Sequence, residues 1–222
     1  MKTPRPWLQF CMFWLATATV SGSVLGDEAP DEVSAAARAG LRPFLESIPA
    51  ADRAAYGFAP VDDLAQAGLG EPFRLYSMAP RDLLNAGPDV TVSSLIRPAG
   101  SWFFPVEVGG EPRAVLTVAE MNGAWTAVGI GKAALAREWS EIGRHWAPRG
   151  YRPRLVAVYQ AAAYFFTLPG LDDYNFTPLS FEGRGFAPGL KSGPGYPELA
   201  ELSQVMAGLK PVVAENLNAP GR

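Results

Sequence analysis

The chain has one histidine and one cysteine, His145 and Cys11, and their positions restrict the chemistry it can perform. Cys11 lies in an apolar N-terminal run that we expect to be removed, which excludes thiol nucleophiles and thiolate metal sites from the mature protein. His145 is then the only side chain whose ordinary pKa lies near neutrality. It lies near the end of a predicted helix, where the helix dipole favours a cation, and this position explains it without catalysis. One histidine also leaves too few ligands for a transition-metal site.

Two pairs of adjacent carboxylates are the other candidates for catalysis or metal binding. Asp62-Asp63 lies in the first turn of a predicted helix, where carboxylates stabilise the helix dipole. Asp172-Asp173 lies in a long loop and could hold Ca²⁺, but it lacks the D-x-[DN]-x-[DN]-G spacing of a calcium loop. Neither the G-x-S-x-G nor the S-x-x-K nucleophile motif occurs in the sequence. A hydrolase that uses His145 or the loop carboxylates therefore stays open as an alternative function.

One segment, Gly129 to Ala134, fits the G-x-G-x-x-A pattern of dinucleotide-binding folds. The preceding strand belongs to a predicted antiparallel hairpin, and no acidic residue near the end of the next strand could bind a ribose. We therefore predict no cofactor and interpret the glycines as a tight strand-to-helix turn. The backbone N–H groups of 131–133 and the charge of Lys132 could still bind a small anion, which makes Lys132 a candidate ligand-binding residue.

Residues 1–26 have the three-part order of a secretory signal peptide. Two basic residues precede an apolar run over 7–20, and small residues follow it up to Gly26. This run is shorter than the roughly 20 residues that span a bilayer, so we expect cleavage near Gly26 and no integral membrane span afterwards. An uncleaved anchor that reaches Leu25 is the alternative. The predicted location is the periplasm or the extracellular medium.

The composition is typical of a globular domain and not of a nucleic-acid-binding chain. Hydrophobic residues make up 48% of the chain and aromatic residues 11%, which is enough apolar surface for a packed core. Removal of Lys2 and Arg5 from the 19 basic residues leaves 17 against 22 acidic ones, a net charge of −5. This acidic balance disfavours binding to nucleic-acid phosphates. Because the mature chain would lack cysteine, its stability must come from core packing and not from disulfides.

We predict a single α+β domain over residues 27–210. Its N-terminal part, 27–88, should be mostly helical. The expected elements there are helices over 31–48, 60–67 and 80–86 and a strand over 73–78. Gly40 and Pro43 predict a break or kink in the first helix.

The part over 89–168 should form the sheet core as a β-β-β-α-β unit. Alternating apolar residues predict an antiparallel β-meander over about 101–130, with turns at Gly109-Gly110 and Asn122-Gly123. An amphipathic helix over 132–146 should dock on this sheet through Trp139 and its apolar neighbours. The apolar run 154–168 should follow as a central strand with a bend near 161–162, and Pro105 should lie at an edge or a bulge.

The C-terminal part shows less periodicity. Residues 169–196 form a long loop rich in glycine and proline, of a length that is usually functional or disordered. Pro197 should open a last helix with Leu199, Leu202, Val205 and Leu209 on one face. A frayed tail is expected over 211–222.

Aromatic side chains on the sheet give the main indication of a binding surface. Trp102 and Phe103 are consecutive and should point to opposite faces, and Trp125 lies on the next-but-one strand. Helices, the long loop, a ligand or a partner must cover these faces, so Trp102, Phe103, Trp125 and Lys132 are the candidate ligand-binding residues, with plain core packing as the alternative. We predict an exported, non-enzymatic binding or accessory protein for a protein partner or a small apolar ligand. The alternative is an exported hydrolase.

Overall fold

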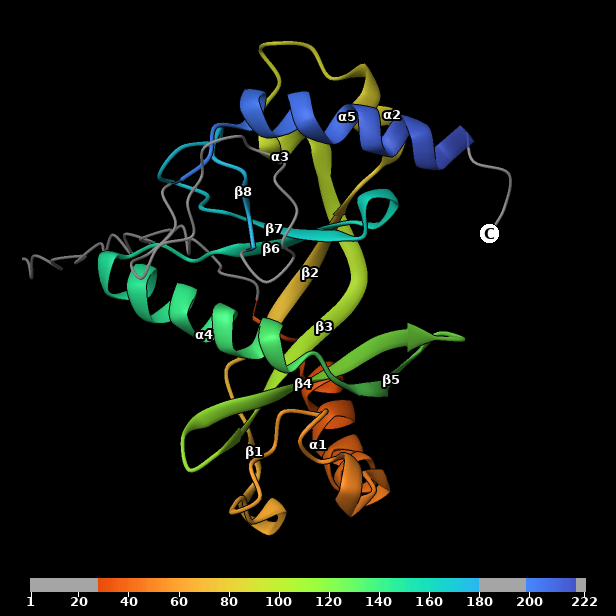
Figure 1. Ribbon diagram of the computed structural model, residues 1–222, viewed down its shortest axis with the longest axis vertical. Coiled ribbons are helices and arrows are strands. Elements are labelled where there is room, and N and C mark those ends of the chain that lie inside the picture. The colour runs from red at the N-terminus through yellow and green to blue at the C-terminus, as the bar shows by residue number, and fades with distance from the viewer. Residues whose placement is uncertain (1–27, 180–198, 219–222) are drawn as a thin grey trace, which may run out of the picture.

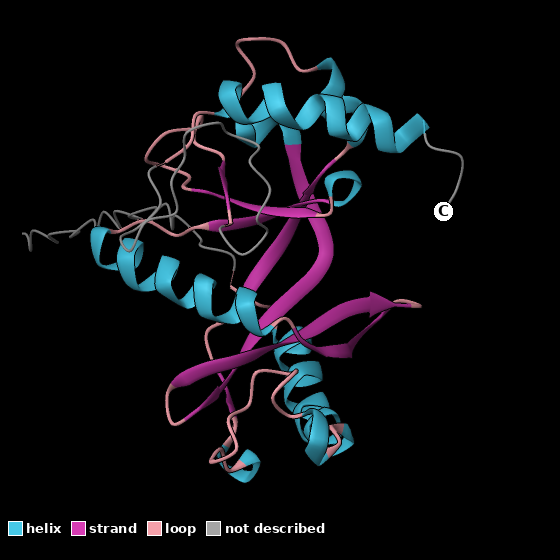
Figure 2. Ribbon diagram, in the orientation of Figure 1, coloured by secondary structure: helices cyan, strands magenta, loops and turns pink. Residues whose placement is uncertain are grey.

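The computed structural model describes residues 28–179 and 199–218, which form a mixed α+β structure. Within these residues, five α-helices pack on an eight-stranded, mostly antiparallel open sheet (Figure 1 and Figure 2). The predicted α+β class is confirmed. The α-helices are α1 (Asp31–Ser47), α2 (Pro80–Asn85), α3 (Val92–Leu95), α4 (Ala133–Trp146) and α5 (Leu202–Asn218). The strands are β1 (Gly68–Leu69), β2 (Phe73–Met78), β3 (Ile96–Val108), β4 (Glu111–Met121), β5 (Ala124–Gly131), β6 (Arg154–Val158), β7 (Ala163–Thr167) and β8 (Thr177–Pro178).

The strands lie in the order β5-β4-β3-β2-β6-β7-β8, and β1 pairs with the end of β3. β3, β4 and β5 are antiparallel neighbours, and Asn122 (φ 54°) and Gly123 (φ 80°) adopt the positive φ angles of an Asn-Gly hairpin turn. β2 lies between β3, to which it is antiparallel, and β6, to which it is parallel. α4 therefore connects the edge strand β5 to β6 on the far side of β2 (Figure 1). The sequence indicated β2 as a strand but not its place in the middle of the sheet.

The apolar run 154–168 forms two strands and not one bent strand. β6 and β7 pair as an antiparallel hairpin around the 3₁₀ turn Tyr159–Ala161. Ala162 follows this turn with a φ of 47°, so the chain reverses where a bend was expected. β6 lies between β2 and β7 and is buried over most of its length, which explains why its residues are apolar on both faces.

Pro105 lies in β3 at a gap between two pairing partners. Residues 96–103 of β3 pair with β2, and residues 106–107 pair with β1. The carbonyl of Pro105 accepts a hydrogen bond from the N–H of Gly70 (2.8 Å). Because the N–H and C=O of one strand residue point to the same side, the missing N–H of Pro105 faces the gap between β1 and β2. The register shift after Val106 agrees with the bulge expected near this proline.

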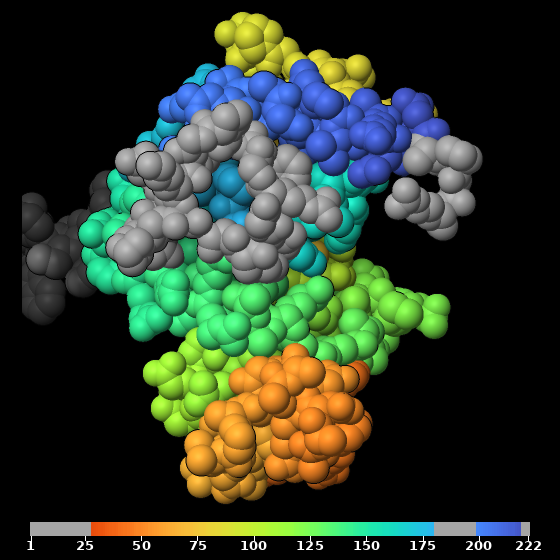
Figure 3. Space-filling view, viewed as in Figure 1, coloured from red at the N-terminus to blue at the C-terminus, as the bar shows by residue number. Residues whose placement is uncertain are grey.

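The helices cover the sheet in three apolar clusters. α1 covers one face of β3, β4 and β5, and α4 covers the opposite face at β2, β4 and β6. α2, α3 and α5 pack together on the upper part of β2, β6 and β7. Figure 3 shows α5 at the upper end of the molecule, α1 at the lower end and α4 between them.

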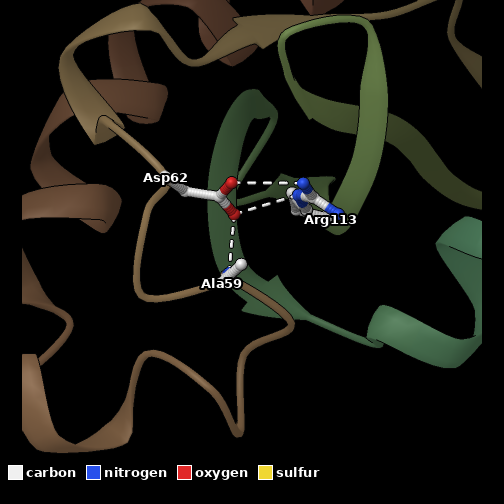
Figure 4. Close-up of polar contacts among 3 residues, drawn as sticks. All are labelled: Ala59, Asp62 and Arg113. Carbon is white, nitrogen blue, oxygen red and sulfur yellow. Dashed lines mark hydrogen bonds and ion pairs between the residues drawn. The ribbon is translucent and has the colours of Figure 1, made fainter.

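The N-terminal part has fewer helical residues than predicted. α1 is one continuous helix through Gly40 and Pro43. The predicted helix over 60–67 is wrong, because this stretch forms only the 3₁₀ turn Leu64–Gln66. Asp62 instead reaches β4, where its carboxylate contacts the Arg113 guanidinium at 2.9 Å and 3.1 Å (Figure 4). The helix predicted over 80–86 is confirmed as α2.

The C-terminal helix begins at Leu202 and buries Leu202, Val205 and Leu209, three of the four residues predicted for its apolar face, whereas Leu199 precedes the helix. It continues through Pro211, so residues 211–218 are helical where a frayed tail was expected. The predicted loop 169–196 is described only to Leu179, and its remainder, like the predicted signal peptide 1–26, lies outside the described residues. Among the residues that are described, no helix has both the length and the apolar character needed to cross a membrane.

Candidate binding pocket

The predicted ligand-binding residues Trp102 and Phe103 lie inside the protein. Each side chain is only 2% exposed. Trp102 packs in the cluster under α1, whereas Phe103 packs under α4, where its ring meets that of Phe73 edge-on at 5.6 Å. Their opposite orientation follows from the alternation of side chains along a strand. Neither ring offers a surface to a ligand, because helices cover both faces at this point.

Trp125 and Lys132 lie nearer the surface and have different partners. Trp125 is half-buried beside α1, and its Nε1 donates a hydrogen bond to the Glu32 carboxylate at 3.0 Å. Lys132 is exposed and precedes α4 in the left-handed conformation (φ 54°), with its ammonium 5.6 Å from the centre of the Tyr164 ring. The four predicted residues are therefore divided between two core clusters and two surface positions, and the structure does not bring them into one site.

A pocket of about 480 Å³ opens between α4 and the start of β2. One wall is a face of α4, a second is the segment over 71–73, and a third is the segment over 150–153 that leads into β6. The volume lies within the range of about 300–1,000 Å³ that is usual for small-molecule sites. The lining residues are Glu71, Pro72, Phe73, Pro105, Trp139, Ser140, Gly143, Ala147, Gly150, Tyr151, Arg152 and Pro153.

Stacked aromatic rings form the apolar part of this pocket. Phe73 and Trp139 stack with ring centres 4.6 Å apart and an interplanar angle of 27°. Phe73 is buried and also contacts Phe103, so the stack rests on the core under α4. Trp139 is half-buried and lines the pocket. The core thus holds the indole in place while part of it stays available to a ligand.

Polar groups lie at the mouth of the pocket. The exposed side chains of Glu71 and Arg152 approach each other to 3.7 Å, an ion pair that contributes at most about 1 kcal/mol to stability. Ser140 adds a hydroxyl to the wall. An aromatic interior with a few polar groups at its border is the usual composition of a site for a small apolar ligand.

The sequence did not indicate this pocket, because the spacing of Trp139 places it in the apolar stripe that docks α4 on the sheet. One signal was present. Gly143 lies one turn after Trp139 on the same face, so the stripe has no side chain at that turn. A Cβ built at Gly143 has no heavy atom within 4 Å, which shows that the structure leaves this space open.

His145, the base of the alternative function, lies at the end of α4. Its ring meets the Trp146 ring at 73° with centres 4.9 Å apart, and the Arg149 guanidinium donates a hydrogen bond to the His145 carbonyl. Burial of the ring and, second, the charge of Arg149 lower the pKa of His145 below 6.5. Desolvation and like-charge repulsion therefore outweigh the helix dipole, which was expected from the sequence to favour a cation here.

The loop carboxylates bind backbone and hydroxyl groups of the protein itself. Asp173 Oδ1 accepts hydrogen bonds from the Ser93 N–H (3.0 Å) and hydroxyl (2.5 Å), and Asp172 Oδ1 accepts one from the Tyr174 N–H (2.7 Å). These bonds fix the loop against α3 and account for both carboxylates without catalysis. Across 28–179 and 199–218, no group of three or more His, Cys, Asp or Glu side chains could hold a metal ion.

The geometry of the pocket beside α4 therefore fits a small ligand. It combines a supported aromatic stack, an open volume and a polar mouth. The assignment rests on this geometry alone, since no family model, no curated protein and no solved structure matches the chain.

Proposed function

We propose that the protein is an exported, non-enzymatic binding protein whose pocket beside α4 takes a small apolar ligand. The Phe73–Trp139 stack is the observation that carries the proposal. A flat apolar group laid on Trp139 would extend this stack and remove the exposed part of the indole from water. The ligand class is the one expected from the sequence, whereas the site moves from Trp102 and Phe103 to Trp139.

Export is part of the same proposal. The basic start, short apolar run and small residues before Asp27 support removal of residues 1–26 as a signal peptide. Intact mass of the protein recovered from the exporting cells tests this step. A chain that begins at Asp27 is the expected result, and a chain that retains Lys2 and Arg5 would instead support the anchored alternative.

The binding step can be tested with the neutral fluorophore N-phenyl-1-naphthylamine. We expect saturable binding to the purified protein and a loss of affinity of about tenfold in Trp139→Ala, because the variant removes the exposed ring of the stack. Trp125→Ala is the matched control, since Trp125 is also half-buried but lies beside α1. Equal affinity in all three proteins would contradict the proposed site.

Two further measurements bear on the ligand and on the alternative function. Native mass spectrometry of the protein from exporting cells should show a small apolar molecule retained by the wild type and lost in Trp139→Ala. A panel of ester, peptide and glycoside substrates tests the hydrolase. An activity that His145→Ala abolishes would overturn the non-enzymatic assignment.

A protein partner is the second candidate, and the edge strand β5 favours it. β5 is the last strand on one side of the sheet, and its eight residues include no charged side chain and no proline. Natural proteins usually protect such edges with charge, proline or a bulge, because unpaired backbone groups recruit another strand, and β5 has of these only the register shift at Val128. An extended segment of a partner protein could add there. A photoreactive residue in place of Val128 should then form protein adducts in exporting cells, and their absence would exclude this candidate.

A further inference from the structure

A second pocket, of about 440 Å³, lies beside α5. One wall is a face of α5, and another is the loop over 86–90 that joins α2 to α3 (Figure 1). Its volume is also usual for a small-molecule site. The pocket shares no lining residue with the one beside α4, and the apolar clusters under α5 and α4 lie on opposite faces of the sheet.

The interior of this pocket is apolar and fixed to the core. Leu202 and Met206, one turn apart on α5, are buried in the cluster under α2, α3 and α5, and both line the pocket. Val90 packs against the same cluster from the loop. Tyr174, which is 45% exposed, adds an aromatic side chain, and its backbone carbonyl accepts a hydrogen bond from the Leu202 N–H. An apolar group placed here would remove these side chains from water.

Small residues keep the pocket open on both walls. A Cβ built at Gly87 in the loop has no heavy atom within 4 Å. Ala207, which faces the pocket from α5, is exposed. The cavity therefore has room for a ligand without movement of the helices.

One cation lies at the end of the apolar interior. Lys210 follows Met206 by one turn on α5 and is half-buried, and its ammonium donates a hydrogen bond to the Ala86 carbonyl at 2.7 Å. An ammonium has three N–H donors, so two remain for water or a ligand. No ion pair between described residues includes Lys210. A ligand that carries a negative charge would complement this end of the pocket.

The other charged residue of the lining is Glu201, at the opposite end of the α5 wall. It lies nine residues before Lys210, a separation of about 13 Å along a helix. This distance exceeds the screening length of about 8 Å at physiological ionic strength, so each charge acts mainly on its own end. One positive charge favours a monoanion, and Glu201 disfavours additional negative charge. The lining thus fits a carboxylate better than a doubly charged phosphate.

We propose that the pocket beside α5 binds a small carboxylic acid with an apolar body. The carboxylate accepts hydrogen bonds from Lys210, and the body lies on Leu202 and Met206. The pocket beside α4 differs in this respect, because the two charged residues that line it, Glu71 and Arg152, pair with each other at 3.7 Å. The two pockets therefore take ligands of different charge.

Titration with octanoate and with the uncharged octan-1-ol, followed by backbone ¹H–¹⁵N signals, tests the proposal. We expect saturable shifts of the Gly87 and Ala207 signals, with octanoate bound at least about tenfold more tightly than octan-1-ol. Lys210→Gln removes the charge but keeps a donor for the Ala86 carbonyl. It should abolish the preference for octanoate and leave the affinity for octan-1-ol unchanged. Lys132→Gln, at an exposed lysine outside the pocket, is the matched control and should keep the preference.

A pair of leucine substitutions on α5 tests the location. Ala207→Leu fills the pocket and should abolish the saturable octanoate shifts, whereas Gln204→Leu, at an exposed position outside the lining, should retain them. Trp139→Ala should also retain them, which separates this site from the pocket beside α4.

Three results would overturn the proposal. The first is the absence of saturable shifts at Gly87 and Ala207. The second is equal affinity of the wild type for octanoate and octan-1-ol, and the third is a preference for octanoate that persists in Lys210→Gln. Failure of N-phenyl-1-naphthylamine to bind would count against the pocket beside α4 alone, since Trp139 lies outside this second lining.

Discussion

The two faces of the sheet at β3 and β4 are similarly aromatic but are closed in different ways. On one face α1 covers Trp102 and Phe104, which are 2% and 3% exposed. On the other face α4 covers Phe103 but leaves Trp139 half-buried beside a pocket. Aromatic content therefore does not distinguish a binding face from a core face. The distance between the sheet and the helix that covers it distinguishes the two faces.

A glycine in each covering helix shows this difference directly. At Gly40 in α1, an added Cβ would overlap the Cβ of Ala127 on β5, so glycine allows the helix to approach the sheet. At Gly143 in α4, an added Cβ has no heavy atom within 4 Å. Glycine thus permits close packing of α1 on one face, whereas in α4 it leaves unfilled space on the other face.

The largest expected loss of stability comes from breaking the ion pair that joins the segment after α1 to β4. Asp62 is 4% exposed and Arg113 28%, and Asp62 Oδ2 also accepts the Ala59 N–H at 2.6 Å (Figure 4). Asp62→Ala should lower the free energy of unfolding by about 3 kcal/mol, because it leaves a partly buried guanidinium unpaired. Urea denaturation measures the loss. Asp63→Ala, the control at the neighbouring exposed residue, should cost about 1 kcal/mol or less, and equal losses would show that the ion pair does not hold this face closed.

Gly40→Leu should lower the free energy of unfolding by about 1–3 kcal/mol, because its side chain forces α1 away from β5. The indole of Trp125, which is tied to Glu32 in α1, should also become more exposed. Urea denaturation and acrylamide quenching of tryptophan fluorescence measure the two effects. A Gly40→Leu protein as stable as the wild type would mean that α1 does not pack this closely.

Gly143→Leu should act in the opposite direction. Leucine has a higher helix propensity than glycine, and its Cβ has no heavy atom within 4 Å, so the free energy of unfolding should rise by about 0.5–1 kcal/mol. Urea denaturation again gives the value. A loss of stability larger than about 1 kcal/mol would show that the α4 face is as closely packed as the α1 face.

The smallest effect concerns the end of α4. Burial and then the charge of Arg149 lower the pKa of His145, so the folded protein binds this proton more weakly than the unfolded chain does. The stability that this shift contributes is present above pH about 6.5 and is lost as the pH falls through the lowered pKa. A ¹H NMR titration of the imidazole should give a midpoint below 6.5 that rises in Arg149→Ala and not in Arg137→Ala. A midpoint above 6.5 would show that the helix dipole dominates.

Local signals in the sequence were sufficient to predict most individual elements. The Asn122-Gly123 turn, the β2 strand over 73–78 and the amphipathic helix α4 each depend on residues close together in the chain. The position of β2 between β3 and β6 depends on pairing between distant segments, which periodicity does not encode. The failed helix over 60–67 has the same cause, because the distant Arg113 binds Asp62 and competes with the helix terminus for its carboxylate.

The candidate site was less predictable than the fold. The sequence identified Trp139 and Gly143 as parts of one helix but not the distance between that helix and the sheet. Whether an aromatic residue is buried or lines a pocket depends on this distance. The sequence therefore assigned Trp102 to a binding surface and Trp139 to the docking of α4, although Trp102 is buried and Trp139 lines the pocket.

Titration of the wild type and Gly143→Leu with N-phenyl-1-naphthylamine tests most directly whether the space beside α4 is a ligand pocket. Arg137→Leu is the control, because it adds the same side chain to an exposed position of α4 outside the pocket lining. The predicted result is that Gly143→Leu stays folded and at least as stable as the wild type but loses saturable binding, while Arg137→Leu retains it. Wild-type affinity in a folded Gly143→Leu protein would contradict a ligand pocket beside α4.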